Sequence, residues 1–393
     1  MFKTSAGSPY HFSLHASDPR DPDGGSRRDT GHTFVCGPTG SGKTVFVGFC
    51  ICLLLKHGST QIVFDKDRGL EILVRALGGE YLAFRRGHVT GCNPLQLPPS
   101  PSNRAFLRRW LRLLVGRRVS AREDAELDQA LDGTLALTPE ARRLSRLLEF
   151  LDPTAADGLY ARVAPWCAVR AGEHAAVFDT ATDRIVQLLG ATPVLGFDMT
   201  DVLDDDAVRQ PLTAYLFHLV ESLLDGRRVV AWLDEFAKLL GDDGFRALAS
   251  DSTKTWRKRN GVIAFATQSP SDLLASPIAR TVIEQTPTKI FFPNADAHRS
   301  DYVDGFGLSE REFELVRTEL TPGSRRFLIK QGRESIVVEL DLKRFDAELK
   351  VISGRSAAVA EMDALRAEFG SEPQRWLPRF LGEKQQSREE EAP

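Results

Sequence analysis

The segment 37–44 limits the possible folds of this chain more than any other, because it reads Gly-Pro-Thr-Gly-Ser-Gly-Lys-Thr. It matches the phosphate-binding (Walker A) pattern G-x-x-x-x-G-K-[ST], and apolar runs flank it at 33–36 and 45–55. Glycines let backbone N–H groups curl around phosphate oxygens, and a helix that begins there adds the partial positive charge of its N-terminus. The sequence therefore predicts a strand, a phosphate-binding loop and a buried helix, in that order.

The sequence of the loop also indicates which residues bind the nucleotide and its metal ion. We expect Lys43 to reach the β- and γ-phosphates, and the Thr44 hydroxyl to ligate Mg²⁺. The residues expected to bind the nucleotide are Gly37, Pro38, Thr39, Gly40, Ser41, Gly42, Lys43, Thr44 and Val45. The predicted ligands are thus a nucleoside triphosphate and Mg²⁺.

A second motif has the Walker B form: the apolar run 229–233 is followed by Asp234 and Glu235. We expect Asp234 to hold Mg²⁺ from its second coordination shell, and Glu235 to accept a proton from the attacking water. An apolar strand ending in two acids is common, but together with the phosphate loop it is specific. We expect strands 33–36 and 229–233 to be neighbours, with the acids facing Lys43. The sequence contains no guanine-reading Asn-Lys-x-Asp motif, which favours ATP over GTP.

Two further residues are candidates for catalysis. Gln268 ends the apolar run 262–266, at the sheet edge where ligands of parallel sheets gather. It is expected to sense the γ-phosphate or to hold the attacking water; alternatively it only caps the next turn. Arg257 lies in a basic stretch before Gly261, where a solvated helix end is common.

In a ring of subunits, the position of Arg257 can project an arginine into the neighbour's site. Such an arginine contributes about 10³–10⁵ in rate. We therefore expect Arg257 to act in trans, with Arg325 and Arg326 as the alternatives.

The predicted fold class is α/β, with a RecA-like core around a mainly parallel sheet. Strands are expected at 33–36, 61–65, 194–198, 229–233, 262–266 and 289–292. Most of these runs are continuously apolar, which is typical of strands buried on both faces. The expected domains are the first part of the core at 1–97, an all-helical insertion at 98–192, the second part of the core at 193–382 and a disordered tail at 383–393.

Several local signals place helices and a hairpin. In the insertion, Ser102 is expected to cap a helix with an apolar face, and its other face carries Arg104, Arg108 and Arg112. Capping boxes are predicted at Ser120 with Glu123 and at Ser309 with Glu312, and a cap with a first-turn proline at Thr138-Pro139. A hairpin is expected from 326–329 and 336–340 across Gln331-Gly332.

Charge and hydropathy narrow the class of partner. The net charge is −3 and the isoelectric point is about 6.3, so no strongly basic surface for nucleic acid is indicated. Any DNA contact would be local, and the three arginines of the insertion are better explained as a solvated face. The longest apolar run, 45–55, is about half the length needed to cross a bilayer, and the start lacks the apolar stretch of a signal peptide. We expect a cytosolic chain, at most peripheral on a membrane.

These motifs together resemble a known family. The segments that carry the resemblance are 31–44, 64–69 (Phe-Asp-Lys-Asp-Arg-Gly), 233–238 (Leu-Asp-Glu-Phe-Ala-Lys), 265–272 and 322–331. They are similar to the ATPase domain of the largest type IV secretion ATPase, the VirB/TrbE/CagE class, over about 2–376. The family is usually about twice as long, with an N-terminal half that docks on the membrane complex, and the loop 17–30 is longer than expected for it.

The resemblance implies a core of the FtsK–HerA kind, hexamers, and a place at the cytoplasmic face of the inner membrane. The implied partners are other type IV secretion ATPases and components of the inner-membrane complex. The family's trans-acting arginine matches Arg257, and its motif glutamine matches Gln268.

The leading hypothesis is a motor that hydrolyses ATP with Mg²⁺ and energises type IV secretion or conjugative transfer and pilus assembly. A DNA-translocating ATPase of the FtsK–HerA kind is the alternative. A third hypothesis is a scaffold that binds ATP only to fix its shape. The intact Glu235 speaks against the scaffold, because a purely structural nucleotide site needs no base.

Overall fold

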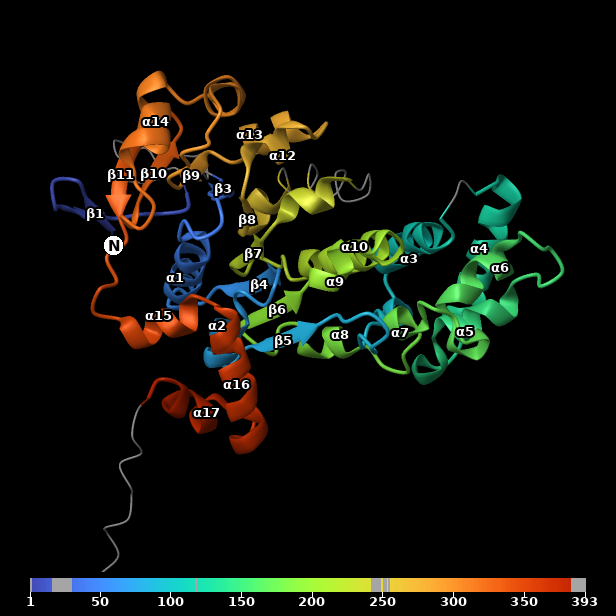
Figure 1. Cartoon of the computed structure of the whole chain (residues 1–393). Coiled ribbons are helices and arrows are strands. Elements are labelled where there is room, and N and C mark those ends of the chain that lie inside the picture. The colour runs from blue at the N-terminus through green and yellow to red at the C-terminus, as the bar shows by residue number, and fades with distance from the viewer. Residues whose placement is uncertain are drawn as a thin grey trace, which may run out of the picture.

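The computed structural model describes residues 2–15, 30–116, 119–241, 249, 253 and 255–382. A single sheet in these residues has the strand order β2-β1-β11-β10-β9-β3-β8-β7-β4-β6-β5 (Figure 1). Its parallel strands are β3 (Thr33–Cys36), β4 (Thr60–Asp65), β5 (Glu80–Ala83), β6 (Val194–Asp198), β7 (Val229–Leu233), β8 (Gly261–Thr267) and β9 (Thr288–Phe291). Antiparallel pairing extends one edge through β10 (Arg326–Gln331), β11 (Glu334–Glu339), β1 (Phe2–Thr4) and β2 (Pro9–Tyr10).

The parallel strands are buried on both faces, as their continuous apolar runs predicted. Along β3, Phe34 packs into one core and Val35 into the other. Helix α1 (Lys43–Leu55) covers one face, and the long helix α10 (Asp206–Ser222) covers the other. The α/β, RecA-like fold class is therefore confirmed.

The prediction that the two motif strands, β3 and β7, are adjacent in the sheet is wrong. Strand β8 lies between β3 and β7, pairing Val35 with Ala266 on one side and Leu233 with Phe265 on the other. The order of strands is set by how the helices pack, and the chain does not encode it locally. One consequence is that the end of β8, with Gln268, falls between the two motifs.

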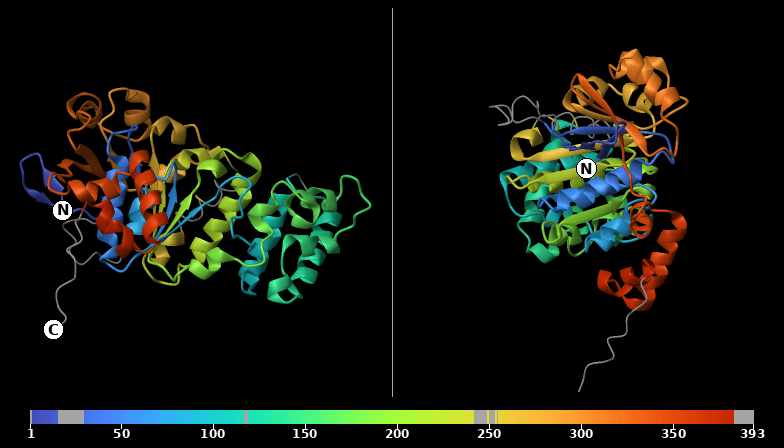
Figure 2. Two further views of the ribbon diagram at one scale, coloured as in Figure 1. Left: turned by 60° about the horizontal axis from the view of Figure 1, so that its bottom comes forward. Right: turned by 90° about the vertical axis from the view of Figure 1, so that its left-hand side faces the viewer.

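The segment between β5 and β6 contains only helices in its described part. They are α3 (Pro101–Leu114), α4 (Ala121–Leu135), α5 (Leu144–Leu147), α6 (Leu159–Val163), α7 (Ala175–Phe178) and α8 (Arg184–Leu188), joined by short 3₁₀ turns. They extend away from the sheet to one side (Figures 1 and 2). The cap of α3 is Ser100 and not Ser102, because Pro101 occupies the first turn and the Ser100 hydroxyl accepts from the Asn103 amide.

The arginine face of α3 is paired with the acids of α4. Arg108 Nε lies 2.8 Å from an oxygen of Asp128, and Arg112 donates two bonds of 2.7 Å to Asp124. Arg104 pairs with Asp132 in the same way. The three arginines therefore belong to a charge ladder between two helices, which fits the solvated-face interpretation better than a DNA-binding strip.

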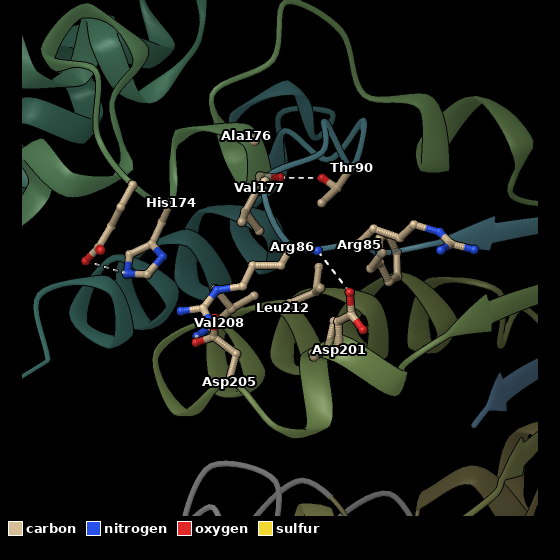
Figure 3. Close-up of a pocket in the computed structure, with 14 residues that line it drawn as sticks. Arg85, Arg86, Thr90, His174, Ala176, Val177, Asp201, Asp205, Val208 and Leu212 are labelled. Carbon is tan, nitrogen blue, oxygen red and sulfur yellow. Dashed lines mark hydrogen bonds and ion pairs between the residues drawn. The ribbon is translucent and has the colours of Figure 1, made fainter. Parts of the chain in front are cut away.

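A cavity of about 570 Å³, including its mouth, lies where the helical segment joins the core. Figure 3 shows α7 beside Thr90 on one side of it and α9 (Thr200–Leu203) and α10 on the other, with Arg86 of the loop after β5 between them. The Arg86 amide donates to Asp201 over 3.1 Å, and the Thr90 amide donates to the Ala176 carbonyl over 3.0 Å. These bonds fix the loop through which the chain enters the helical segment.

The remaining helices of the described residues follow β8, β9 and the hairpin of β10 and β11. They are α12 (Pro270–Leu274), α13 (Ala279–Gln285), α14 (Glu310–Glu314) with π-helical turns at Ser300–Gly305 and Leu315–Glu319, α15 (Asp346–Ile352), α16 (Ser356–Phe369) and α17 (Pro373–Phe380). The last three pack near α1 and α2 (Glu71–Ala76). Both predicted capping boxes are present, whereas Thr138 precedes Pro139 without a side-chain cap bond. The expected tail 383–393 and most of the loop 17–30 lie outside the described residues.

None of the helices in the described ranges combines the length and the apolar character needed to cross a membrane.

Candidate nucleotide-binding site

The phosphate loop runs from the end of β3 into the first turn of α1. Gly42 adopts φ 104°, which an L-side chain rarely tolerates, and it lets the chain enter the helix at Lys43. At Gly37 an added Cβ would lie only 2.6 Å from the Cβ of Phe292, so the loop must pass close to β9 without a side chain. The N–H groups of the first turn have no partner within the helix. This is the arrangement that receives phosphate oxygens at a helix N-terminus.

Lys43 lies between the two acids of the Walker B motif. Its Nζ is 3.1 Å from Oε1 of Glu235 and 3.5 Å from Oδ1 of Asp234, and its side chain is only 9% exposed. The three side chains come from α1, which follows β3, and from the turn after β7, and β8 lies between β3 and β7. The structure therefore brings the ammonium and both carboxylates into one cluster.

The backbone at the Walker B acids is held in an unusual conformation. Glu235 has φ 51°, in the left-handed region that non-glycine residues seldom occupy. The preceding Asp234 amide donates to the Phe64 carbonyl of β4 over 2.9 Å. Burial raises the pKa of Asp234, and the Lys43 ammonium opposes that shift. The left-handed turn directs Glu235 toward the phosphate loop.

Gln268 also reaches the phosphate loop. Its Oε1 accepts a hydrogen bond of 2.8 Å from the Thr39 hydroxyl, and its side chain is otherwise exposed. Gly37, at the start of the loop, donates its N–H to the Thr267 carbonyl over 3.2 Å. The end of β8 is thus bonded to the loop through both backbone and side chain.

The donors fit a Mg²⁺–nucleotide complex. Thr44 and Asp234 line the same narrow crevice, and their hydroxyl and carboxylate oxygens are hard ligands of the kind Mg²⁺ prefers. Ser41 Oγ is buried and has no partner in the described residues. A buried hydroxyl without a partner is costly, so the loop has a polar group to offer a ligand.

The arginine candidates lie in different places. Arg257 belongs to the 3₁₀ turn η7 (Trp256–Arg259), which precedes β8, so it lies at the amino edge of the parallel strands. Since β8 spans about 20 Å at 3.3 Å per residue, Arg257 is far from the phosphate loop of its own chain. Arg325 precedes β10 and Arg326 begins it. Because β10 is antiparallel to β9, both lie at the carboxyl edge. They pair with Asp341 at 3.8 Å and Glu339 at 3.5 Å.

One residue near the site received no role from the sequence. Asp65 ends β4, is 1% exposed and accepts from the Leu70 amide (2.8 Å) and the Tyr81 hydroxyl (2.7 Å). Burial raises its pKa well above the usual range. It holds the loop that follows β4, beside Asp234. An acid directly after a buried strand was the available signal, the same one that identified Asp234.

The fold and this cluster define a P-loop nucleoside triphosphatase of the RecA-like type. No protein-family model matches the sequence. The chain is 44% identical over 384 residues to the type IV secretion system protein virB4 of Bartonella henselae, covering 97% of this chain and 47% of that protein. It is 36% identical over 389 residues to the protein virB4 of Agrobacterium fabrum, with the same coverage of both chains. The chain spans about half the length of the curated relatives it matches.

A solved structure shares the architecture. The VirB4 structure of Thermoanaerobacter pseudethanolicus matches with a TM-score of 0.66 at 19% identity, covering 87% of this chain and 96% of that one. Over the part of those proteins that it spans, the chain belongs to the VirB4 family of type IV secretion systems, as the sequence resemblance predicted.

Proposed function

We propose that this chain hydrolyses ATP with Mg²⁺ and that the cycle drives a type IV secretion or conjugation machine, including pilus assembly. The observation that carries the proposal is the cluster of Lys43, Asp234 and Glu235, with Gln268 bonded to the phosphate loop beside it. The Bartonella henselae relative, at 44% identity, is by its name a protein of a type IV secretion system. The plasmid coupling protein TrwB, which has a similar fold, has been solved with ADP and Mg²⁺ and with an ATP analogue.

In the proposed reaction the phosphate loop binds the nucleotide, and the two Walker B acids hold the metal ion and activate the water. The N–H groups of the loop and the Lys43 ammonium neutralise phosphate charge, which requires Lys43 to turn from Glu235 toward the nucleotide. Thr44 and Asp234 would hold Mg²⁺, which supplies positive charge at the phosphates when bound. Glu235, released from Lys43, accepts the proton of the attacking water. Gln268 orients that water or contacts the γ-phosphate and so couples its presence to the position of β8.

The arginine at the amino edge is assigned to a neighbouring subunit. Because Arg257 lies about one strand length from its own phosphate loop, it can serve catalysis only at another chain's site. We therefore include in the proposal a ring of subunits, a hexamer, in which Arg257 completes the adjacent site. Arg325 and Arg326 remain the alternatives, at the edge that carries their own chain's nucleotide.

The partners and the location are part of the same proposal. A ring at the cytoplasmic face of the inner membrane would work with other type IV secretion ATPases and with components of the membrane complex. The support is the kinship with virB4 proteins, of which this chain spans about half. DNA translocation is the alternative motor activity; the arginines of α3 do not favour it, because α4 supplies their counter-charges.

The decisive test is Glu235→Gln, which keeps the size of the side chain and removes the base. We expect turnover to fall by about 10²–10⁴-fold, the usual contribution of a general base, while ATP binding is kept. Turnover is measured with Mg-ATP, and binding with a fluorescent ATP analogue. Glu284→Gln, on the exposed side of α13, is the matched control and should behave as the wild type.

Undiminished turnover in Glu235→Gln would overturn the proposed chemistry. Absent turnover in the wild type, with nucleotide binding kept, would point to the scaffold. Turnover that rises with DNA and falls steeply with salt would favour the translocase.

A further inference from the structure

A buried histidine links the strand of the phosphate loop to the turn that carries Arg257. His32 precedes β3 and is fully buried. Its Nδ1 accepts the Ile263 N–H of β8 over 2.9 Å, and its Nε2 lies 2.9 Å from the Thr253 carbonyl. A backbone N–H can only donate and a carbonyl can only accept. The ring is therefore the neutral tautomer with hydrogen on Nε2, bonded at both ends.

The surroundings keep the imidazole in that state. Burial, with smaller contributions from the nearby charges of His15 and Arg257, lowers the pKa of His32 to about 4. At neutral pH the ring therefore carries no charge, and both hydrogen bonds persist. The 2.9 Å contact with the Thr253 carbonyl places the ring beside the residue that leads toward the turn.

The base of the turn is anchored, whereas its basic side chains face outward. Thr253 and Trp256 are both fully buried, and the Trp256 indole donates to Glu221 over 3.4 Å. On the other side, Asn260 takes φ 60° and its side-chain amide donates to the Gly226 carbonyl over 2.7 Å. Between these anchors lie the exposed residues Arg257, Lys258 and Arg259.

Strand β3 joins this anchor to the phosphate loop. His32 stands before the first residue of β3, and Gly37 follows its last, so about 13–16 Å of one rigid strand separates them. No other strand has the phosphate loop at one end. Strand β3 therefore positions the phosphate loop of its own chain at one end and, through His32, the turn that carries Arg257 at the other.

We infer that His32 is a positioning residue for Arg257: its hydrogen bond to Thr253 holds the turn in the place from which the arginine reaches the neighbouring subunit's nucleotide. The inference rests on the proposed trans role of Arg257. A misplacement of about 1 Å can cost on the order of 10² in rate, so loss of this bond has a measurable effect on turnover even when the chain stays folded.

Two substitutions separate the two bonds of the ring. In His32→Asn the side-chain oxygen replaces Nδ1 and still accepts from Ile263, but nothing reaches Thr253. In His32→Gln the longer amide replaces Nε2 and still donates to Thr253. We expect His32→Asn to lower kcat by roughly 10–100-fold with unchanged ATP binding, and His32→Gln to retain more of the wild-type kcat. Thr288→Val is the control, since it removes buried hydrogen bonds at the same sheet edge without touching the turn.

Mixing experiments decide which site the histidine serves. His32→Asn mixed with Lys43→Ala should regain turnover, because the Lys43→Ala chain supplies a well-placed arginine to the intact site of its neighbour. His32→Asn mixed with Arg257→Ala should not, because neither chain supplies one. If His32 only shapes its own phosphate loop, the pattern reverses: the mixture with Arg257→Ala regains turnover and that with Lys43→Ala does not.

The reference mixture is Arg257→Ala with Lys43→Ala, at a protein concentration where wild-type specific activity is constant. If this reference mixture regains turnover but the two His32→Asn mixtures show the reversed result or no difference, the role of His32 is overturned and the trans role of Arg257 stands. No rescue in the reference overturns the trans role of Arg257, and the inference with it. Equal effects of His32→Asn, His32→Gln and Thr288→Val on kcat and on thermal unfolding would identify a merely structural histidine and also overturn the inference.

Discussion

The two edges of the parallel sheet differ in how much of their chemistry one chain supplies. At the carboxyl edge, Lys43, Asp234 and Glu235 form a closed cluster, with the phosphate loop and Gln268 around it. At the amino edge, an anchored turn presents basic side chains to the outside, about a strand length from any phosphate loop of the same chain. One edge has the groups to bind a nucleotide by itself, and in the proposed function the other edge serves a neighbouring chain.

Because of this difference between the edges, substitutions at each edge should have different effects on ATP binding and on ATP turnover. At the carboxyl edge, loss of Lys43 should affect both, since it holds the phosphates, whereas loss of the base Glu235 should lower turnover and leave binding intact. Changes at the amino edge should affect turnover alone, and only when chains are associated.

Arg257→Ala should lower kcat by about 10³-fold or more, the contribution of an arginine that stabilises transferred phosphoryl charge. ATP affinity should stay the same, because the residue is remote from its own site. Lys258→Ala and Arg259→Ala, in the same exposed turn, are the matched controls and should change kcat little. The measurements are Mg-ATP turnover and equilibrium binding of a fluorescent ATP analogue.

Dilution should mimic the arginine variant. Wild-type turnover per chain should fall as the protein is diluted, whereas nucleotide bound per chain should not. If turnover is independent of concentration, or if Arg325→Ala has the larger effect, the two edges do not divide the work in the proposed way.

Gln268→Ala should have an intermediate effect, a fall in kcat of about 10-fold to 10²-fold, because it removes one polar group that orients the reaction. Thr39→Val is the informative companion, since it removes only the hydroxyl that bonds to Gln268. If Gln268 merely caps a turn, both variants will keep wild-type kcat and differ only in thermal unfolding.

The sequence was sufficient where its signals are local. Continuous apolar runs gave the parallel strands, and the residues 37–44 and 229–235 specified loop, helix and acids because phosphate binding leaves few alternatives to glycine, lysine and acid at those spacings. Strand β5 was missed because it has only two buried residues and sits at the sheet edge. The cap of α3 was misplaced by two residues, although Pro101 was the better signal.

What the sequence could not provide are contacts between distant segments. The position of β8 between β3 and β7 depends on the packing of helices on both faces. The roles of His32 and Asp65 depend on which backbone groups tertiary structure brings to them, and a single buried histidine or acid has no characteristic spacing. The left-handed conformation of Glu235 is equally invisible before the fold is known.

The smallest effect is expected in the helical segment, where the charges are balanced within one chain. Asp128→Asn removes the partner of Arg108, and because both side chains are about one-third exposed, we expect a loss of about 0.2–1 kcal/mol in the free energy of unfolding and no change in kcat. Urea denaturation measures the first and Mg-ATP turnover the second, with Asp296→Asn, in the loop after β9, as a control for losing an exposed acid.

Removing all three acids of α4 that pair with the arginines of α3 tests the charge balance of the helical segment more strongly. With Asp124, Asp128 and Asp132 changed to Asn, the arginines of α3 lose their counter-charges, and DNA affinity should rise and depend steeply on salt between about 50 and 200 mM. Fluorescence anisotropy with duplex DNA compares this variant with the wild type. Wild-type binding that is already as tight and as salt-dependent would show that the chain holds DNA elsewhere, and the basic turn Arg257–Arg259 would then be the first surface to test.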